Sequence, residues 1–318
     1  MSTDSSRRSF LKHAGAASAA AAAASTLLPT SAASAAPAAV APGGAPKKAV
    51  LIGMLPKELP YPERFALARE VGFEGMEVNT VDNPADAEAM AKAAQSAKLP
   101  IHSVMNSEHW RSPLSSSDPA VVDKSVKGML TSIANAKLFG AETVLLVPAV
   151  VDAKTSYQDA WTRSHRVITE RILPAAEKQG IIIGIEEVWN KFLLSPLEMN
   201  AYVDSFKSKY VQAYFDVGNV VFYGYPQDWI RTLGPRIKKV HLKDFRQERG
   251  KGTYDFVHLG EGDIDWQDVR KALHEIGYNG YVTTEIKGGD KAYLSDVVAR
   301  IDRFLAGQPP VARTTPSA

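Results

Sequence analysis

Short apolar runs alternate with longer stretches of helical periodicity through most of this chain. Eight runs rich in β-branched residues predict strands, and several of the stretches between them repeat apolar positions every three to four residues. The predicted strands are residues 49–54, 75–78, 101–104, 143–147, 181–186, 211–216, 237–242 and 281–286. Eight alternating strands and helices predict an α/β fold, a closed (β/α)8 TIM barrel with all strands parallel.

Helix boundaries in the pattern are marked by residues with known local preferences. Residues 119–138 and 157–179 are predicted helices that stop at Gly140 and Gly180, where glycine can take the left-handed conformation. Ser195 followed by Pro196 predicts a helix N-cap and a first-turn proline.

Four polar residues stand where predicted strands end: Glu186, Asp216, His241 and Glu285. They are separated by 30, 25 and 44 residues, and a strand-plus-helix unit takes roughly 30. They are therefore expected on strands five to eight, with an inserted loop before the last. Any one of them alone reads as a turn residue or N-cap. Together, at the end of a barrel where active sites form, they predict a functional site.

The donor set of this site predicts its metal. Three carboxylates, one imidazole and no thiolate favour one divalent ion, Mn2+ first, with Mg2+ or Co2+ as alternatives. A cation that binds a carbonyl and a neighbouring hydroxyl acidifies the C–H between them. Glu186 and Glu285 are the expected acid/base pair, because strands five and eight are expected to face each other across the barrel mouth. Proton return to the same carbon inverts it, and return to its neighbour moves the carbonyl by one carbon.

Several strings in combination resemble a known family, and the resemblance spans about residues 48–305. They are GFEGMEV (72–78), PLSSSDP (113–119), IEEVWNKF (185–192), FDVGN, VHLKD and LGEGDIDW (259–266). The chain resembles the sugar phosphate isomerase/epimerase family with a xylose-isomerase-like TIM barrel, especially its ketose 3-epimerase and hexulose-phosphate isomerase branch. The resemblance implies that Glu186, Asp216, His241 and Glu285 bind one metal ion, and it selects Glu186 over Glu187 as the ligand.

Further residues are candidates for contact with a sugar substrate, and most have a structural reading as well. They are Glu77, His102, His109, Trp110, Trp189, Asn190, Asn219 and Lys243. His102 is equally well explained as a structural residue, and Glu77 as part of a salt bridge. Lys243 follows His241 by two positions and is expected on its face of the strand.

Two departures from the family leave the substrate open. Ketose 3-epimerases commonly carry His where this chain has Asn219, and a Glu near the position of Phe192 or Leu193. In the loop after the seventh predicted strand, Arg246, Arg249 and Lys251 suggest either an anion site or solvated surface, and no P-loop pattern occurs. His258 and Glu261 in that loop are candidates for the mouth of the barrel.

The N-terminal residues predict export. Arg7 and Arg8 lie in a twin-arginine motif, an Ala-rich apolar stretch follows, and Ala33-Ser34-Ala35 suits cleavage. The expected parts are a signal peptide and linker (1–46), a catalytic barrel (47–307) and a disordered tail (308–318), with the mature protein periplasmic or secreted. The apolar stretch is too short for a stable membrane anchor.

Charge and cysteine content narrow the classes of partner. Without the three basic residues and one acidic residue of the N-terminal segment, 34 basic and 34 acidic residues remain. This balance argues against a general attraction to nucleic acid or anionic membrane. Absence of cysteine excludes disulfides. A small sugar is the expected partner, and a homo-oligomer is compatible with these observations.

Three functions remain open at this point. The first is a sugar epimerase or aldose–ketose isomerase. The second is an exported lyase or dehydratase that acts on a keto-sugar or 3-keto-glycoside, in which the same proton abstraction expels a leaving group. The third is a non-catalytic sugar-binding barrel, which the intact set of ligands disfavours. Product analysis separates the first two, because elimination yields an unsaturated product.

Overall fold

The computed structural model describes residues 44–248 and 250–311. The twin-arginine motif and the predicted cleavage site lie outside the described residues, as do Arg249 and residues 312–318 of the predicted tail. Residues 308–311 have no regular secondary structure, but Arg303 donates hydrogen bonds to the carbonyl of Pro309.

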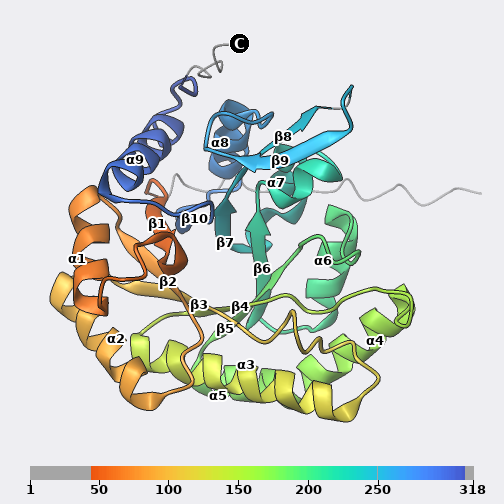
Figure 1. Cartoon of the computed structure of the whole chain (residues 1–318). Helices are drawn as coiled ribbons and strands as arrows, with labels where there is room; N and C mark the ends of the chain where they lie inside the picture. Colours follow the sequence, from red (N-terminus) through yellow and green to blue (C-terminus); the bar gives the residue numbers. More distant parts are fainter. Residues whose placement is uncertain (1–43, 249, 312–318) are drawn as a thin grey trace, which may run out of the picture. The chain divides into compact units, whose positions relative to one another are not determined.

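Eight parallel strands close into a barrel, which confirms the predicted fold (Figure 1). The strands are β1 Lys47–Leu51, β2 Gly75–Asn79, β3 Ile101–Met105, β4 Thr143–Leu146, β5 Ile182–Glu186, β6 Val211–Asp216, β7 Ile237–Leu242 and β10 Tyr281–Thr284. Neighbours follow the order β1-β10-β7-β6-β5-β4-β3-β2. All eight predicted strands are present. The first is shorter than predicted, because Ile52–Met54 forms a 3-10 turn, η2.

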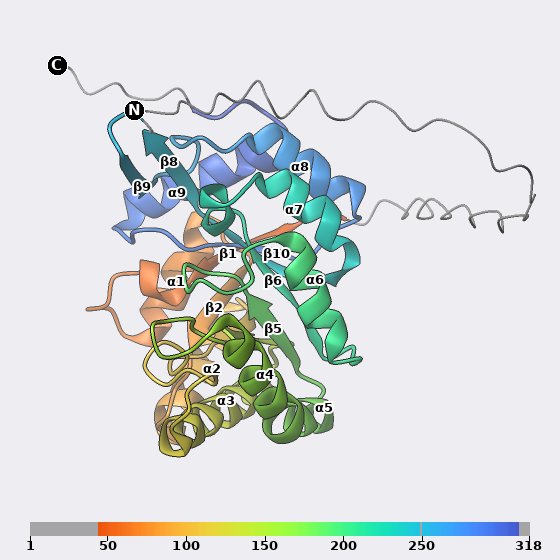
Figure 2. The ribbon, with the colours of Figure 1, turned by 90° about the vertical axis from the view of Figure 1, so that its right-hand side faces the viewer.

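Helices surround the barrel (Figures 1 and 2). They are α1 Tyr61–Val71, α2 Pro84–Ala97, α3 Pro119–Phe139, α4 Tyr157–Val167, α5 Leu173–Gln179, α6 Pro196–Ser205, α7 Pro226–Leu233, α8 Trp266–Glu275 and α9 Lys291–Leu305. Two further short 3-10 turns are η4 Asn219–Phe222 and η5 Gly234–Arg236. No helix among residues 44–248 and 250–311 is long and apolar enough to cross a membrane.

Predicted helix ends agree with the structure, but one predicted helix is interrupted. Gly140 and Gly180 both adopt φ of 72° and end α3 and α5. The Ser195 side chain accepts a hydrogen bond from the backbone N–H of Glu198 at the start of α6. Residues 157–179 are divided by a π-helical turn, η3 Ile168–Ile172. Pro174 lies two residues after the end of this turn, and proline has no N–H to continue regular helical hydrogen bonding.

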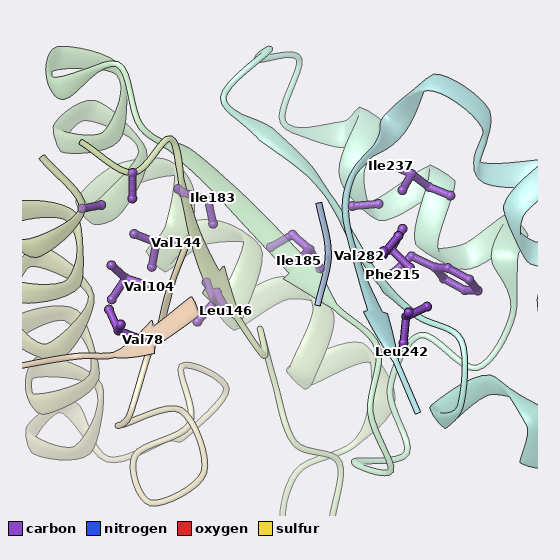
Figure 3. Packing of buried hydrophobic residues seen from close by; sticks show 14 of the residues in the cluster. Val78, Val104, Val144, Leu146, Ile183, Ile185, Phe215, Ile237, Leu242 and Val282 are labelled. Carbon is purple, nitrogen blue, oxygen red and sulfur yellow. The ribbon is translucent and has the colours of Figure 1, made fainter. Parts of the chain in front are cut away.

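Apolar side chains between the strands and helices form the main core (Figure 3). Val78, Val104, Val144 and Ile183 are successive register partners across β2, β3, β4 and β5, so they form one continuous row. All four are fully buried. This packing fixes the strands relative to one another and therefore the positions of the side chains at their carboxyl ends.

An antiparallel hairpin occupies much of the predicted insertion after β7. It consists of β8 Asp244–Glu248 and β9 Thr253–Val257. The hairpin forms a separate two-stranded sheet, apart from the barrel strands in both ribbon views (Figures 1 and 2). The sequence analysis predicted only a loop here.

Candidate metal centre

The four predicted ligands converge at the carboxyl ends of four neighbouring strands. Glu186 and Asp216 are the last residues of β5 and β6, His241 is the penultimate residue of β7, and Glu285 directly follows β10. One ligand atom from each lies within 4.8 Å of the others. This separation suits a single ion that binds all four.

His241 presents its Nδ1 atom to the three carboxylates. Nδ1 lies 2.9 Å from Glu186 Oε1, 3.0 Å from Glu285 Oε2 and 3.7 Å from Asp216 Oδ2. Glu186 and Glu285 therefore flank one imidazole. Their strands are separated by β6 and β7 and do not face each other directly across the barrel, which corrects the sequence-based expectation.

Asp216 supports the metal assignment through its two different oxygens. Oδ1 accepts hydrogen bonds from the backbone N–H groups of Gly218 and Asn219 at 2.7 and 2.8 Å. Oδ2 is buried and accepts no hydrogen bond among the described residues, although the Lys243 ammonium lies 3.1 Å away. A carboxylate oxygen can accept from more than one partner, so Oδ2 has room for a cation bound by Glu186, His241 and Glu285.

Glu187 faces away from this cluster. Its Oε1 accepts a hydrogen bond from the backbone N–H of Asp216 at 2.8 Å, so it fixes β5 against β6. Adjacent strand residues point to opposite sides. This orientation agrees with the choice of Glu186 as the ligand and gives Glu187 a supporting position.

Glu77 lies on the far side of the His241 ring and is fully buried. Its Oε2 is 2.6 Å from His241 Nε2 and accepts from the Tyr214 hydroxyl at 2.8 Å, while its Oε1 accepts from Ser103 at 3.1 Å. The pairing with His241 agrees with the salt-bridge reading of Glu77, and its oxygens are held by protein groups. A proton on Nε2, donated to Glu77, leaves the Nδ1 lone pair for a metal.

Two irregularities in the barrel accompany this arrangement. The β2–β3 register shifts between Met76 and Glu77, and the β6–β7 register shifts between Ala213 and Tyr214. Such shifts re-aim side chains. Both coincide with residues that support His241, and a strict alternation pattern in the sequence could not reveal them.

Lys243 borders the cluster on its more exposed side. Its Nζ atom is 2.9 Å from Glu285 Oε2 and 3.1 Å from Asp216 Oδ2, and its side chain is 14% exposed. The ammonium therefore partly neutralises the carboxylates and remains within reach of the solvent side.

The two candidate acid/base residues have different electrostatic environments. Burial raises the pKa of Glu186 to about 7, against the opposing effect of His241. Burial also acts to raise the pKa of Glu285, but Lys243 and His241 outweigh it and hold that pKa below its usual range. Glu285 therefore favours the ionised form, whereas Glu186 can carry a proton near neutral pH.

Three other residues predicted to contact substrate have protein partners. His102 is the second residue of β3. Its ring stacks on Tyr281 with centroids 4.2 Å apart, and its Nε2 lies 3.0 Å from Thr283 Oγ1, which agrees with its structural reading. The Asn190 amide donates to the Ala149 carbonyl at 2.6 Å. The Asn219 amide donates to the Glu187 carbonyl at 3.0 Å. Both amides fix loops, and their substrate contacts stay predictions.

The predicted aromatic and histidine candidates are divided between surface and interior. Trp110 and Trp189 are 54% and 38% exposed, so both indole rings reach solvent. His109 is buried, and its Nδ1 accepts a hydrogen bond from the Val147 N–H at 3.3 Å. Burial lowers the pKa of His109 to about 4, opposed by the charge of Glu285. His109 is thus a neutral imidazole close enough to Glu285 to be influenced by its charge.

Comparison with known proteins identifies the family. Residues 65–303 match the model of the xylose isomerase-like TIM barrel family. The chain belongs to this family. An L-ribulose-5-phosphate 3-epimerase, UlaE, of Escherichia coli O1:K1 / APEC is 25% identical over 249 residues, which are 73% of this chain and 86% of that protein.

Solved structures agree at the level of the fold. D-allulose 3-epimerase from Methylomonas sp. aligns with a TM-score of 0.68 at 18% identity, covering 84% of this chain and 100% of that chain. A 3-keto-D-glucoside 4-epimerase of E. coli, YcjR, aligns with a TM-score of 0.65 at 16% identity, covering 80% and 98%. These three relatives are named as epimerases, so they lend no support to the lyase alternative.

The segment after β7 is organised around Asp244. Asp244 Oδ2 accepts from the N–H groups of Gly260 and Gly262 and from the Trp266 indole at 2.7, 2.9 and 3.0 Å. Of the basic residues suggested for an anion site, Arg246 donates to the Glu261 carbonyl and Lys251 pairs with Glu248, while Arg249 lies outside the described residues. His258 and Glu261 pair with Asp296 and Arg300 of α9, and their place at the mouth of the barrel stays a prediction.

The supporting groups Tyr214 and Ser103 and the aromatic residues of the hairpin were not among the predicted site residues. Tyr214 and Ser103 lie within apolar strands, where no local pattern marks a hydrogen-bonding role. The alternation in Thr253–Val257, with Tyr254 and Phe256 two positions apart, was a signal for the missed strand β9.

Proposed function

We propose that this chain is a divalent-metal-dependent sugar epimerase or isomerase that acts through proton abstraction and an enediolate. The observation that carries the proposal is the convergence of Glu186, Asp216, His241 and Glu285 within 4.8 Å. The epimerase names of the relatives support the same class of reaction. Mn2+ is our first expectation, because three of the four donors are carboxylates, which are hard ligands.

The residues present fit a divalent ion held by Glu186 Oε1, Asp216 Oδ2, His241 Nδ1 and Glu285 Oε2. When bound, such an ion supplies Lewis-acid polarisation of a substrate carbonyl and stabilises negative charge that develops on oxygen.

Glu285 and Glu186 divide the proton chemistry in this proposal. Glu285, held ionised beside Lys243, accepts the proton from the substrate carbon. Glu186, which flanks the same His241 Nδ1 atom as Glu285, is the group that returns a proton. Return to the same carbon from the other side inverts it, and return to the adjacent carbon exchanges aldose for ketose.

The remaining residues orient these groups and the substrate. Glu77 holds the His241 ring through Nε2, so Nδ1 keeps a fixed direction. Lys243 is placed to donate a hydrogen bond to a substrate oxygen. Trp189 and Trp110 offer partly exposed ring surfaces for the apolar side of a sugar.

Substrate-proton exchange provides the direct test. The purified full-length protein, with Mn2+ added, should be incubated in D2O with free, phosphorylated and 3-keto sugars and followed by NMR. We expect deuterium to enter one sugar at the carbon next to its carbonyl, together with an epimerised or isomerised product. An unsaturated product would show elimination, and absence of exchange with all three classes would contradict the proposed reaction.

Replacement of either Glu then tests the assignment of roles. Glu186→Gln and Glu285→Gln, assayed metal-loaded, should each lose about 10²–10⁴-fold in turnover, as expected for loss of a positioned acid or base. At least one variant should still exchange deuterium from the side of the surviving Glu. Glu70→Gln, at an exposed ion pair with Lys291, is the matched control and should keep full turnover. Full turnover in metal-loaded Glu285→Gln would place the proton chemistry elsewhere.

A further inference from the structure

Four partly exposed aromatic side chains form a contiguous patch beside the candidate metal centre. Trp189, Phe222, Tyr254 and Phe256 are 38%, 45%, 53% and 37% exposed, and we refer to these four as the aromatic patch. They come from the loop after β5, from η4 and from β9. Contiguous exposed apolar surface of this kind marks a binding site more often than isolated surface residues do.

The hairpin is built to present rings on one face. Phe245 pairs with Phe256 and Gln247 with Tyr254 in the β8–β9 register. Side chains alternate between the faces of a strand, so Phe245, Tyr254 and Phe256 share one face. Asp255 lies on the other face and is exposed. The hairpin is therefore amphipathic, with its aromatic face toward Trp189.

The four rings of the aromatic patch contact one another, but these contacts do not bury them. Trp189 stacks on Phe256 with centroids 5.0 Å apart and an interplanar angle of 19°. It also contacts Phe222 and Tyr254, each at a centroid distance of 5.8 Å. Phe245 is fully buried against the same rings, so the patch has a rigid base and an exposed outer side.

Lys243 connects the patch to the metal centre. Its Nζ atom lies 5.5 Å from the centroid of the Phe256 ring and 2.9 Å from Glu285 Oε2. Trp189 is also only three residues after Glu186. The aromatic patch therefore lies next to the four ligands. If one end of a substrate binds at the ligands, a group attached to that end can contact the patch.

We propose that the aromatic patch is a subsite for a second ring of the substrate, so that the preferred substrate is a disaccharide or another glycoside rather than a free monosaccharide. This inference rests on the proposed function. Sugar rings have faces of C–H groups that pack on aromatic rings and hydroxyl edges that stay in water, and a partly exposed patch suits both. Specific recognition of the reacting ring is left to the metal centre.

Binding measurements on a matched pair of ketoses test the subsite. The probes are D-fructose and isomaltulose, which is fructose carrying a glucosyl group on O6, titrated by ligand-observed NMR into the full chain loaded with Mg2+. We expect isomaltulose to bind at least about tenfold more tightly. Tyr254→Ala and Phe222→Ala should each reduce that preference severalfold. Tyr225→Ala, whose side chain is 71% exposed and lies outside the patch, should leave both affinities unchanged.

Equal affinities for the two ketoses in the unaltered protein, or a preference that survives both substitutions, would overturn the subsite. Light scattering of the same proteins tests another occupant. If Tyr254→Ala turns a dimer into a monomer without changing the ketose preference, the patch is an interface between copies of the chain and the proposal is wrong. Failure of deuterium exchange with every sugar would contradict the proposed reaction separately, because binding of the second ring is measured without turnover.

Discussion

At the residue scale, the metal centre depends on Glu77, a carboxylate outside the predicted set of metal ligands. Glu77 is fully buried and lies 2.6 Å from His241 Nε2. Hydrogen bonds of this kind fix the tautomer and direction of a ligating histidine. The position of Glu77 therefore has a measurable consequence for metal affinity.

Glu77→Gln should weaken Mn2+ binding about 10- to 100-fold, because the amide keeps a similar shape but lacks the charge opposite Nε2. Titration of the purified protein followed by EPR of free Mn2+ measures this change. Glu142→Gln is the matched control: Glu142 pairs with Lys239 and precedes β4, at the other end of the barrel strands. Unchanged affinity in a folded Glu77→Gln protein would rule out the supporting role.

Metal binding should also release more protons at pH 6 than at pH 8.5. Glu186, with its pKa near 7, is largely protonated at the lower pH and must lose that proton to bind a cation. Calorimetry in buffers with different ionisation heats counts the protons. Equal release at both pH values would show that Glu186 is ionised throughout.

The same group gives a stability prediction for the metal-free protein. Burial raises the folded-state pKa of Glu186 above its unfolded value. At pH values between these two pKa values, the folded state therefore binds a proton that the unfolded state does not. Stability from this group is present at low pH and is lost as pH rises through about 7. Thermal unfolding in EDTA measures this effect. Between pH 6 and pH 8, the Tm of Glu186→Gln should decrease less than the Tm of the unaltered protein.

At the scale of elements, Asp244 organises the segment between the hairpin and α8. Its carboxylate receives three backbone N–H groups and the Trp266 indole, and a Cβ at Gly262 would lie 2.0 Å from Asp244 Oδ1. Only a residue without a side chain fits there. The motif LGEGDIDW is thereby explained by packing around one buried carboxylate.

Asp244→Ala should lower the free energy of unfolding by about 3 kcal/mol or more, because several buried donors lose their acceptor. Urea unfolding followed by tryptophan fluorescence measures the loss. Asp255→Ala, on the exposed outer face of the hairpin, should change stability by less than about 0.5 kcal/mol. Similar values for the two variants would contradict the role of Asp244.

At the scale of the whole molecule, we propose that the protein is exported through the twin-arginine route. The Arg7-Arg8 pair, the following Ala-rich stretch and the cleavage-like Ala33-Ser34-Ala35 support this proposal. Export of a folded protein lets Mn2+ be bound before the chain meets Cu2+ and Zn2+, which bind most open sites more tightly.

Replacing both arginines by lysine keeps the charge of the segment and removes the motif. The Arg7→Lys/Arg8→Lys protein should accumulate uncleaved inside the cell, whereas the unaltered protein appears outside the cytoplasm shortened by about 35–46 residues. Fractionation and mass spectrometry separate the two. Lys47→Arg, just beyond the predicted signal, is the control, and normal export of the double variant would contradict the route.

The sequence by itself determined the strands, the helix ends at Gly140 and Gly180, the helix start at Ser195 and the positions of the four ligands. Each of these depends on local preferences: β-branched runs, capping residues, and a polar side chain where a strand ends. Glu186 and Asp216 end their strands as predicted, and His241 and Glu285 lie within one residue of a strand end. The parallel barrel then brings those ends together.

Only the tertiary structure decided what the other candidates contact. Glu77, Asn190 and Asn219 are polar residues near strand ends or in the following loops, yet each points to a protein partner supplied by a distant segment. Register shifts at Glu77 and Tyr214 change which side chains enter the barrel, and Pro174 interrupts a helix whose apolar period continues. Local sequence encodes the element and its ends, whereas side-chain direction depends on register, and register is set by packing across the closed barrel.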